Sequence, residues 1–455
     1  MDNVDVVVVG ARCAGAPLAT MLARRGLNVC LVDRATFPSE LPSTHVLQPC
    51  GALILHQLGV LDALWNAGAA PLDRFLLVID DVRMDVSMDV RDFGLPGLCV
   101  RRVTLDAVLV GAAREVGVDV RTRTNVTGLI RDGGRVAGVE TNAGPIRSRL
   151  VVGADGPHSR VAQLVGAEEY GVAAPGRLFA WGYYRGVPRD STLRLQRVGE
   201  RGFIATPTDG GLYLAGVVPQ LEYKAEFMAD REAYYAADVE AMPELAELLD
   251  GAEREGPLRV VSSWHGYFRR SAGPGWALVG DAGQFKDPTP GQGIGDALRQ
   301  AHRMADMIAT TYTDQLALDD ALQRWWQWRD RDAREMHWFA ADLGAPGEVL
   351  PLRRWMMGDL ASTPATAMSF IRVMNHDIPP SKVMTGRRLA RAVVEVGRSR
   401  AVPLRDVARE AAGLVRDNVK RARLDGPKPV VRRARRPSAV NASASERAVA
   451  SASRS

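Results

Sequence analysis

The sequence predicts an α/β fold in which a Rossmann-like domain is interrupted by an antiparallel β-sheet and followed by a helical C-terminal region. Three observations support this prediction. Residues 4–34 read as strand, helix and strand, with glycines at the first turn. Residues 73–99 and 177–220 alternate apolar and polar positions between turn signals, which is typical of antiparallel strands. From about residue 295 onward the pattern is helical.

Length and composition bound the class of protein. With 455 residues, of which 46% are hydrophobic, the chain can bury more than one core. No apolar run approaches the roughly 18 residues that span a bilayer, and no basic leader precedes the first strand, so we expect a cytoplasmic protein. The cysteines are scattered singly without a CxxC pair, which predicts reduced thiols and no metal site.

The first turn has the features of a dinucleotide site. The apolar run Val6–Val9 leads into Gly10 and Gly15, and N–H groups at the start of the next helix can hold a pyrophosphate. Asp33 ends the second strand and suits the acid that accepts a hydrogen bond from a ribose hydroxyl. Arg12 occupies the place of the usual middle glycine, where its cation can contact a phosphate. An ordinary βαβ crossover is the alternative.

Two later motifs point to a longer cofactor. The segment VVGADGPHSR places Asp155 and Gly156 at the end of a strand. The segment VGDAGQFKDPTPGQGIGDALRQ places Gly280 and Asp281 at another strand end, before prolines, glycines and a helix.

With these three motifs in this order, residues 1–325 resemble the FAD-dependent oxidoreductases of the p-hydroxybenzoate hydroxylase and geranylgeranyl reductase superfamily. This superfamily includes group A aromatic-ring monooxygenases, geranylgeranyl reductases and flavin halogenases. The resemblance implies a Rossmann-like FAD-binding domain of the GR2 type, with an inserted antiparallel β-sheet substrate domain. The implied divisions are 1–75, 100–172 and 260–325 for FAD binding, 76–99 and 173–259 for substrate, 326–425 for a helical region and 426–455 for a disordered basic tail.

The resemblance also implies which residues hold the cofactor. Arg102 contacts its phosphate or ribityl region, and Asp155 with Gly156 serves FAD and the approach of a nicotinamide donor. Pro288 lies against the flavin beside the substrate cavity. The other implied contacts are Gly10, Arg12, Gly15, Asp33 and Arg34 at the ADP half, Gly280 and Asp281 at the ribityl chain, and Gly293 and Ile294 at the pyrimidine end.

Each assignment has a simpler alternative, and the motif departs from the family in two places. Asp33 could cap a loop, Arg102 could be a surface cation and Asp281 a helix N-cap. Gly295 stands where the family often has Asn, and Pro290 where a glycine is common.

Candidate catalytic and substrate residues come from other segments. His45 is expected near the isoalloxazine, where an ordinary pKa near ~6.5 suits a donor or a proton shuttle; a loop histidine is the alternative. Cys50 precedes Gly51 in a place where archaeal geranylgeranyl reductases carry a cysteine. The aromatic-rich strands predict that Trp181, Tyr183 and His265 line a substrate pocket, with core packing as the alternative.

The motifs favour one reaction among several. No second dinucleotide fingerprint and no CxxC occur, so NADPH or NADH is expected to bind transiently at the flavin. The leading hypothesis is a monooxygenase that transfers one oxygen atom of O2, through a flavin hydroperoxide, to an aromatic or polyketide-like small molecule. An isoprenoid-saturating reductase and a non-catalytic flavin-binding protein are the alternatives.

Two missing motifs weigh against the other enzymes of the superfamily. The lipid-pocket motif YxWxFP of the reductases is absent, because Gly202, Ile204 and Thr206 occupy its positions. The halogenase motif WxWxIP is absent too, and Lys286 is the only lysine in a flavin motif.

The C-terminal region is helical and basic. Breaks in the helical pattern are expected near Pro351, Pro379 and Pro403. A tryptophan-rich stripe that runs from Trp325 to Phe339 is expected to pack on the FAD domain.

The net charge is +12 from Arg387 onward and −7 before it. Residues 386–424 alternate arginine with apolar residues, which predicts a helix packed on the domain. Such a helix can alternatively lie on an anionic membrane. No groove-reading element accompanies the charge, so nucleic acid is excluded as a partner. The oligomeric state is left open.

Overall fold

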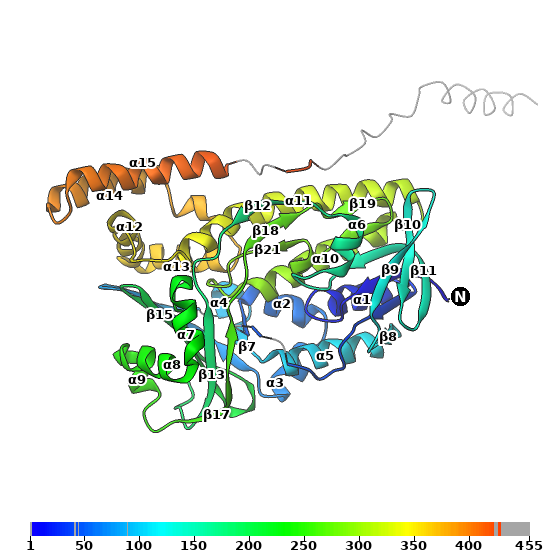
Figure 1. The fold of residues 1–455 in the computed structure, drawn as a ribbon, viewed down its shortest axis with the longest axis horizontal. Coiled ribbons are helices and arrows are strands. Elements are labelled where there is room, and N and C mark those ends of the chain that lie inside the picture. The colour runs from blue at the N-terminus through cyan, green and yellow to red at the C-terminus, as the bar shows by residue number, and fades with distance from the viewer. Residues whose placement is uncertain (1, 41, 44, 89, 423–425, 429–455) are drawn as a thin grey trace, which may run out of the picture.

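The computed structural model contains two large β-sheets with helices packed around them (Figure 1). It describes all residues except 1, 41, 44, 89, 423–425 and 429–455. The tail predicted at 426–455 therefore lies outside the described residues, apart from 426–428.

The first sheet is the predicted Rossmann-like sheet. Its parallel strands follow the order β20-β11-β1-β2-β8, with β19 antiparallel at one edge and the β9–β10 hairpin attached to β11. The strands are β1 (Asp2–Val9), β2 (Val29–Val32), β8 (Asp119–Arg121), β9 (Val126–Asp132), β10 (Arg135–Thr141), β11 (Gly144–Gly153), β19 (Ala272–Gly273) and β20 (Trp276–Leu278).

Burial on both faces explains the composition of these strands. Val6, Val7 and Val8 are fully buried, and alternate members of this run belong to different hydrophobic clusters. A parallel sheet covered on both sides therefore requires a continuous apolar run rather than alternation. The main covering helices are α1 (Gly15–Ala23), α5 (Arg102–Glu115), α6 (Arg160–Val165) and α10 (Gly293–Thr311).

The second sheet has the order β17-β13-β16-β15-β14-β5-β6. Its strands are β5 (Arg74–Ile79), β6 (Val82–Ser87), β13 (Phe179–Arg185), β14 (Thr192–Val198), β15 (Arg201–Pro207), β16 (Tyr213–Val217) and β17 (Glu253–Val261). One part of the prediction is wrong, because β5 and β14 pair in parallel. These strands are joined by a long excursion through the first domain, so no hairpin turn imposes opposite directions.

Smaller elements connect the two sheets. Two three-stranded sheets consist of β3 (Val46–Leu47), β7 (Gly97–Cys99) and β4 (Ala70–Leu72), and of β12 (Glu169–Ala173), β18 (Gly266–Arg269) and β21 (Gln284–Phe285). The remaining helices before α10 are α2 (Pro49–Gln57), α3 (Leu61–Asn66), α4 (Val90–Phe93), α7 (Lys224–Ala229), α8 (Arg231–Glu240) and α9 (Pro243–Leu248), with short turns η1 (Asp209–Gly211), η2 (Leu221–Tyr223) and η3 (Gly280–Ala282).

The predicted C-terminal helices are present, and prolines lie where they start. Pro351 is the first residue of α12, and Pro403 immediately precedes α15. A proline at a helix start loses no hydrogen bond, because the first N–H groups have no partner in the helix. The helices are α11 (Gln315–Leu343), α12 (Pro351–Ala361), α13 (Pro364–Met374), η4 (Pro380–Lys382), α14 (Gly386–Ser399) and α15 (Leu404–Arg421).

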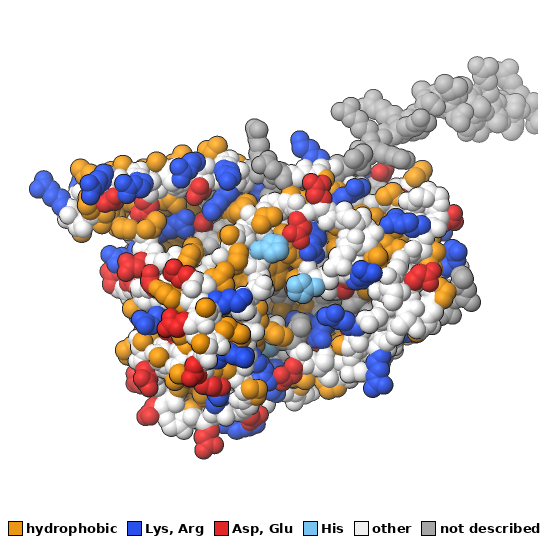
Figure 2. Space-filling model, in the orientation of Figure 1, with side chains coloured by type: hydrophobic (Ala, Val, Ile, Leu, Met, Phe, Trp, Pro, Cys, Tyr) orange, Lys and Arg blue, Asp and Glu red, His pale blue; other side chains and the backbone are white. Residues whose placement is uncertain are grey.

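Four of the predicted domain boundaries cut through secondary structure. Those after residues 75, 172, 259 and 325 fall inside β5, β12, β17 and α11. The α14–α15 pair forms a ridge at one edge of the molecule (Figures 1 and 2). Among the described residues, no helix combines the length and apolarity needed to cross a bilayer.

Candidate active site

The turn after β1 is closed to side chains. Gly10 has φ +102°, and a Cβ there would lie 2.4 Å from the carbonyl oxygen of Ala154. A Cβ at Gly15 would lie 1.7 Å from the carbonyl oxygen of Gly10. Both positions therefore require glycine, which keeps the start of α1 accessible as an anion-binding N-terminus.

Asp33 connects this turn to the end of β2. Its Oδ2 accepts the N–H of Ala11 at 2.7 Å and its Oδ1 that of Ala35 at 2.8 Å. It therefore does cap its loop, and each oxygen keeps a second lone pair for a ribose hydroxyl. Its neighbour Arg34 is exposed.

Arg12 and Arg102 share one carboxylate. An Arg12 guanidinium nitrogen lies 2.6 Å from Asp106 Oδ2, and Arg102 Nε lies 3.0 Å from Oδ1. Asp106 is fully buried and Arg102 is 9% exposed, so Arg102 is not a surface cation. Arg12 also donates to Ser39 Oγ at 3.0 Å. Two cations on one anion leave a net positive charge beside the glycine turn, which suits a phosphate.

The mid-chain motif has a structural role that the sequence did not predict. Asp155 accepts hydrogen bonds from Ser159 Oγ at 2.5 Å and from the N–H of Arg160 at 2.6 Å, at the start of α6. Burial raises the pKa of Asp155. Gly156 has φ +78° with open space where a Cβ would point.

The late motif places an unpartnered carboxylate next to the first turn. A Cβ on Gly280 would lie 2.9 Å from the Cβ of Ala14, just before α1. No described residue donates a hydrogen bond to the Asp281 carboxylate, so Asp281 is not an N-cap. Burial raises its pKa to about 6, although Arg102 opposes the shift. A Cβ on Gly293, at the start of α10, would meet nothing within 4 Å.

These features fit FAD. An unpartnered acid, a net cationic pair and two helix N-termini lie where the resemblance expects ribityl, phosphate and flavin contacts. The specific contacts of the predicted residues, Ile294 at the α10 N-terminus among them, stay predictions.

His45 lies next to the second sheet, and its pKa differs from the ordinary value of a histidine. It is 2% exposed, and its Nε2 is hydrogen-bonded to the hydroxyl of Tyr183. Burial, helped by Arg102, lowers its pKa to about 3. The imidazole is therefore neutral at physiological pH, and its expected role near the isoalloxazine stays a prediction.

Cys50 lies next to the N-terminus of α10. It is half-buried, and its Sγ lies 3.9 Å from the position of a Cβ on Gly295. Its N–H donates to Asn375 Oδ1 at 2.8 Å. Burial raises the pKa of its thiol to about 12.

A buried ion cluster joins the late motif to the C-terminal region. Lys286 Nζ lies 2.7 Å from Asp296 Oδ2, and His376 Nε2 lies 2.9 Å from Asp296 Oδ1. Lys286 also donates to Gln292 Oε1 at 2.7 Å. Burial lowers the pKa of Lys286 and of His376, and Asp296 opposes both shifts.

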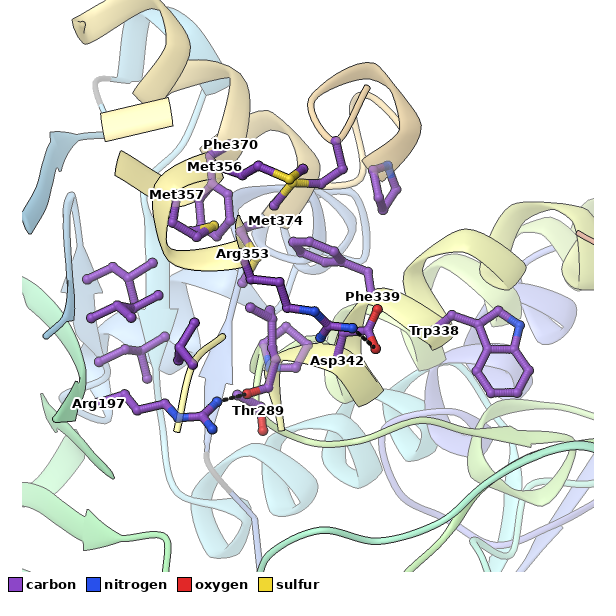
Figure 3. Close-up of a pocket in the computed structure, with 18 of the residues that line it drawn as sticks. Arg197, Thr289, Trp338, Phe339, Asp342, Arg353, Met356, Met357, Phe370 and Met374 are labelled. Atoms are coloured by element: carbon purple, nitrogen blue, oxygen red, sulfur yellow. Dashed lines mark hydrogen bonds and ion pairs between the residues drawn. The ribbon is translucent and has the colours of Figure 1, made fainter. Parts of the chain in front are cut away.

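A cavity of about 490 Å³ lies between the second sheet and the C-terminal helices. Pro288, Thr289 and Pro290 of the late motif line it. Figure 3 shows Arg353 beside Asp342, with several apolar side chains grouped near them. The apolar lining includes Phe75, Leu77, Phe179, Leu195, Ile204, Trp264, Trp338, Phe339, Met356, Met357, Phe370, Met374, Leu389 and Leu414.

Three of the predicted pocket residues lie elsewhere. Trp181 is fully buried behind the wall, stacked on Phe179 with 4.7 Å between ring centroids. Tyr183 faces His45 rather than the cavity. His265 is exposed and lies 3.0 Å from Glu169. Phe179, Trp181 and Tyr183 alternate onto one face of β13, so their distance along the strand, and not side-chain direction, separates Trp181 and Tyr183 from the cavity.

The tryptophan-rich stripe divides between two places. Trp325 is buried in the core beneath the Rossmann-like sheet, as predicted. Phe339 and Trp338, further along α11, line the cavity instead. The C-terminal region therefore lines the cavity, which the sequence did not predict.

Among the arginines that line the cavity, Arg177 and Arg197 next to the second sheet form no ion pair with a carboxylate of the described residues. Arg177 donates to the carbonyl oxygens of Glu200 and Val218, and both Arg177 and Arg197 donate to carbonyl oxygens of the 343–347 loop. Burial, with Arg177 nearby, lowers the pKa of Arg197 to about 10, so it stays protonated. Sequence reasoning missed both, since the residue type alone carries no signal of an arginine's partners.

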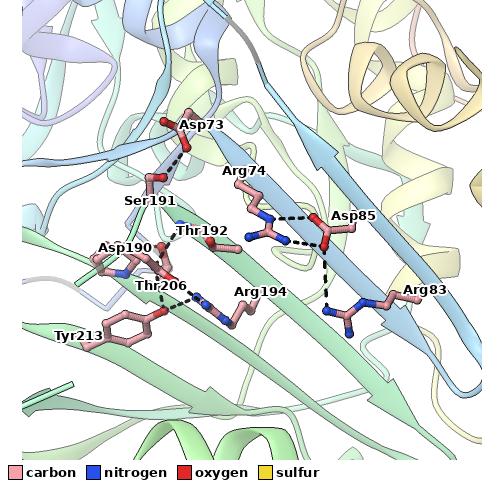
Figure 4. A network of polar contacts seen from close by, with 11 residues as sticks. Asp73, Arg74, Arg83, Asp85, Asp190, Ser191, Thr192, Arg194, Thr206 and Tyr213 are labelled. Carbon is pink, nitrogen blue, oxygen red and sulfur yellow. Dashed lines mark hydrogen bonds and ion pairs between the residues drawn. The ribbon is translucent and has the colours of Figure 1, made fainter. Parts of the chain in front are cut away.

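On the other face of the second sheet lies a hollow whose arginines are paired with carboxylates. Arg74 forms two hydrogen bonds with Asp85, and Arg194 pairs with Asp190 (Figure 4). Arg74 and Arg194 line this hollow. Arg177 and Arg197, which form no ion pair among the described residues, lie on the cavity side instead.

Comparisons with known proteins agree with this arrangement. The family described as "FAD binding domain" matches residues 3–337. The chain is 29% identical to the 6-methylpretetramide 4-monooxygenase of Streptomyces rimosus over 311 residues, 66% of this chain and 73% of that protein. It is 27% identical to digeranylgeranylglycerophospholipid reductase 1 of Methanococcoides burtonii over 356 residues, 74% of this chain and 82% of that one.

A solved structure shares the fold. A flavoprotein/dehydrogenase from Cytophaga hutchinsonii, 19% identical, superposes with a TM-score of 0.74 over 87% of this chain and 100% of that chain. The glycine turn, the unpartnered Asp281 and the α10 N-terminus all fall within the matched residues. This chain therefore belongs to the FAD-binding-domain family, in the superfamily of p-hydroxybenzoate hydroxylase and geranylgeranyl reductase flavoproteins, and is an FAD-dependent oxidoreductase.

Proposed function

We propose that this enzyme is an NAD(P)H-dependent monooxygenase that inserts one oxygen atom of O2 into an aromatic or polyketide-like small molecule. The observation that carries the proposal is the shared segment Pro288–Pro290. It follows Asp281 in the flavin motif and also lines the cavity, which supports a substrate site adjoining the flavin site.

The chain's own residues would hold FAD and exclude water. Asp281 would accept hydrogen bonds from ribityl hydroxyls, and the α10 N-terminus would stabilise negative charge at the pyrimidine end. FAD supplies the two-electron chemistry between NADPH or NADH, O2 and substrate. In the balanced reaction, substrate, O2, NAD(P)H and a proton give hydroxylated substrate, water and NAD(P)+.

The cavity favours a substrate class. Its aromatic and methionine-rich walls suit a large, flat apolar molecule. Arg177 and Arg197 supply positive charge without a carboxylate partner, which favours an acidic or enolic oxygen on that molecule. The 6-methylpretetramide 4-monooxygenase relative supports the same class.

A reductase is the second candidate. Cys50 beside Gly295 at the start of α10 favours it, as does the similarity to the digeranylgeranylglycerophospholipid reductase. Against it, Gly202 and Ile204 line the cavity where the aromatic lipid motif is missing.

One experiment separates the two candidates. The FAD-loaded protein is incubated with NADPH or NADH, isotopically heavy O2, and either polycyclic phenols or isoprenoid lipids. We expect a phenolic product that carries one heavy oxygen atom and forms in step with NAD(P)H oxidation. A saturated isoprenoid without heavy oxygen would instead establish the reductase.

A further inference from the structure

The outer face of the α14–α15 pair combines apolar and cationic side chains. The inner face packs on α12, where Ala392, Val396 and Val407 join Leu352 and Met356 in one hydrophobic cluster. This agrees with the expectation of a helix packed on the domain. The outer face is left without a partner among the described residues.

An apolar stripe follows the outer face of α15. Leu404, Val415 and Val419 are 69%, 53% and 71% exposed. Spacings of 11 and 15 residues return to nearly the same side of a helix with 3.6 residues per turn. Ala408 and Ala412 are exposed between them, so the stripe is continuous. Val394 of α14 is exposed as well.

A cationic stripe lies beside the apolar one. The side chains of Arg405, Arg409 and Arg416 are 81%, 77% and 80% exposed. Their ion pairs with Asp406 and Asp417 are exposed and therefore weak. Figure 2 shows orange side chains along the edge of the ridge with blue ones next to them.

We propose that this face of α14–α15 binds the surface of an anionic lipid bilayer, with the apolar stripe inserted and the cations at the headgroups. Residues 386–421 contain ten Lys or Arg against four Asp or Glu, so the charge is complementary to such a surface. Interfacial helices have this pairing of an apolar stripe with flanking cations. A second copy of the chain would place cations against cations.

The position of the pair connects this surface to the cavity. Leu389 of α14 and Leu414 of α15 line the cavity from within. The same two helices therefore present one side to the cavity and the other to the lipid. The proposal does not depend on the reaction that the flavin site performs.

The test uses the FAD-loaded full chain and vesicle co-sedimentation. We expect binding to vesicles that contain phosphatidylglycerol, little binding to pure phosphatidylcholine, and weakening by salt. The double variant Val415→Ser, Val419→Ser is expected to bind roughly tenfold more weakly. A matched control, Val172→Ser with Val198→Ser, alters exposed valines elsewhere and should bind as the unchanged chain does.

The valine variant is decisive because it keeps every charge. Residues beyond 428 are also basic, so electrostatic attraction alone cannot identify the surface. Unchanged binding of Val415→Ser, Val419→Ser would overturn the proposal. Equal loss in the control pair, or no binding to anionic vesicles, would do so too. Tighter binding to polyglutamate than to vesicles would assign the face to an acidic polypeptide instead.

Discussion

At the scale of single residues, Asp281 offers the most direct test of the cofactor site. We expect Asp281→Asn to weaken FAD binding about tenfold, because an amide accepts hydrogen bonds less strongly than a carboxylate. Fluorescence titration of the apoprotein with FAD measures the change.

A parallel variant, Asp33→Ala, should also weaken FAD retention, and full FAD occupancy there would remove the ribose assignment.

The same carboxylate predicts a pH dependence of apoprotein stability. Burial raises the pKa of Asp281 to about 6 from the ordinary value of 3.8. The group therefore favours the folded state below pH 3.8, and this contribution is lost as the pH rises through about 6. Apo Asp281→Asn should be more stable than the unchanged apoprotein at about pH 8 but not at about pH 4. Thermal unfolding at both pH values tests this, and parallel curves would contradict it.

Tyr183 and His45 form a buried pair. The pH dependence that His45 predicts is opposite in direction to that of Asp281. The pKa of His45 is lowered from 6.5 to about 3, so its stability contribution is lost as the pH falls through 6.5 toward 3. Tyr183→Phe removes the partner of His45 Nε2 and should cost about 1–2 kcal/mol of unfolding free energy. Tyr184→Phe, the control, should cost less, since Tyr235 keeps its bond to the Ala215 carbonyl. Urea unfolding compares the two, and equal losses would argue against a specific role for the pair.

At the scale of elements, β5 separates the cavity from the outer hollow. Leu77 lines the cavity, whereas Leu76 lines the hollow on the other face. We expect Leu77→Trp to fill the cavity and raise the KM for substrate about tenfold, because overpacking excludes the ligand. Leu76→Trp should leave KM unchanged, and neither variant should alter FAD affinity. If both variants change KM alike, the substrate does not occupy this cavity.

At the scale of the whole molecule, Asp296 couples the FAD-binding half to the C-terminal region through Lys286 and His376. Asp296→Asn leaves a buried ammonium without its counter-ion and should cost about 3 kcal/mol or more of unfolding free energy. Asp332→Asn breaks the partly exposed Arg299 pair and should cost about 1 kcal/mol or less. Lys286→Met added to Asp296→Asn should recover part of the loss. Denaturant unfolding measures all three, and no recovery would mean that the cluster is not energetically coupled.

Patterns within a few neighbouring residues account for the parts of the fold that the sequence predicted. The Val6–Val9 run, Gly10 and Gly15 identify a turn without side chains because their steric requirement lies within a few residues. The proline breaks were predictable for the same reason. The strand direction of β5 was not, because its partner β14 lies more than a hundred residues away and no turn joins them.

The sequence by itself therefore determined the Rossmann-like turn, the order of the three flavin motifs and the helical nature of the C-terminal region. These depend on local backbone geometry and on periodicity. Only the tertiary structure decided that α11 to α15 close the cavity, that Arg177 and Arg197 face it without a carboxylate partner, and that His45 is neutral. Those properties depend on burial and on neighbours distant in the chain, and residue type and spacing do not encode them.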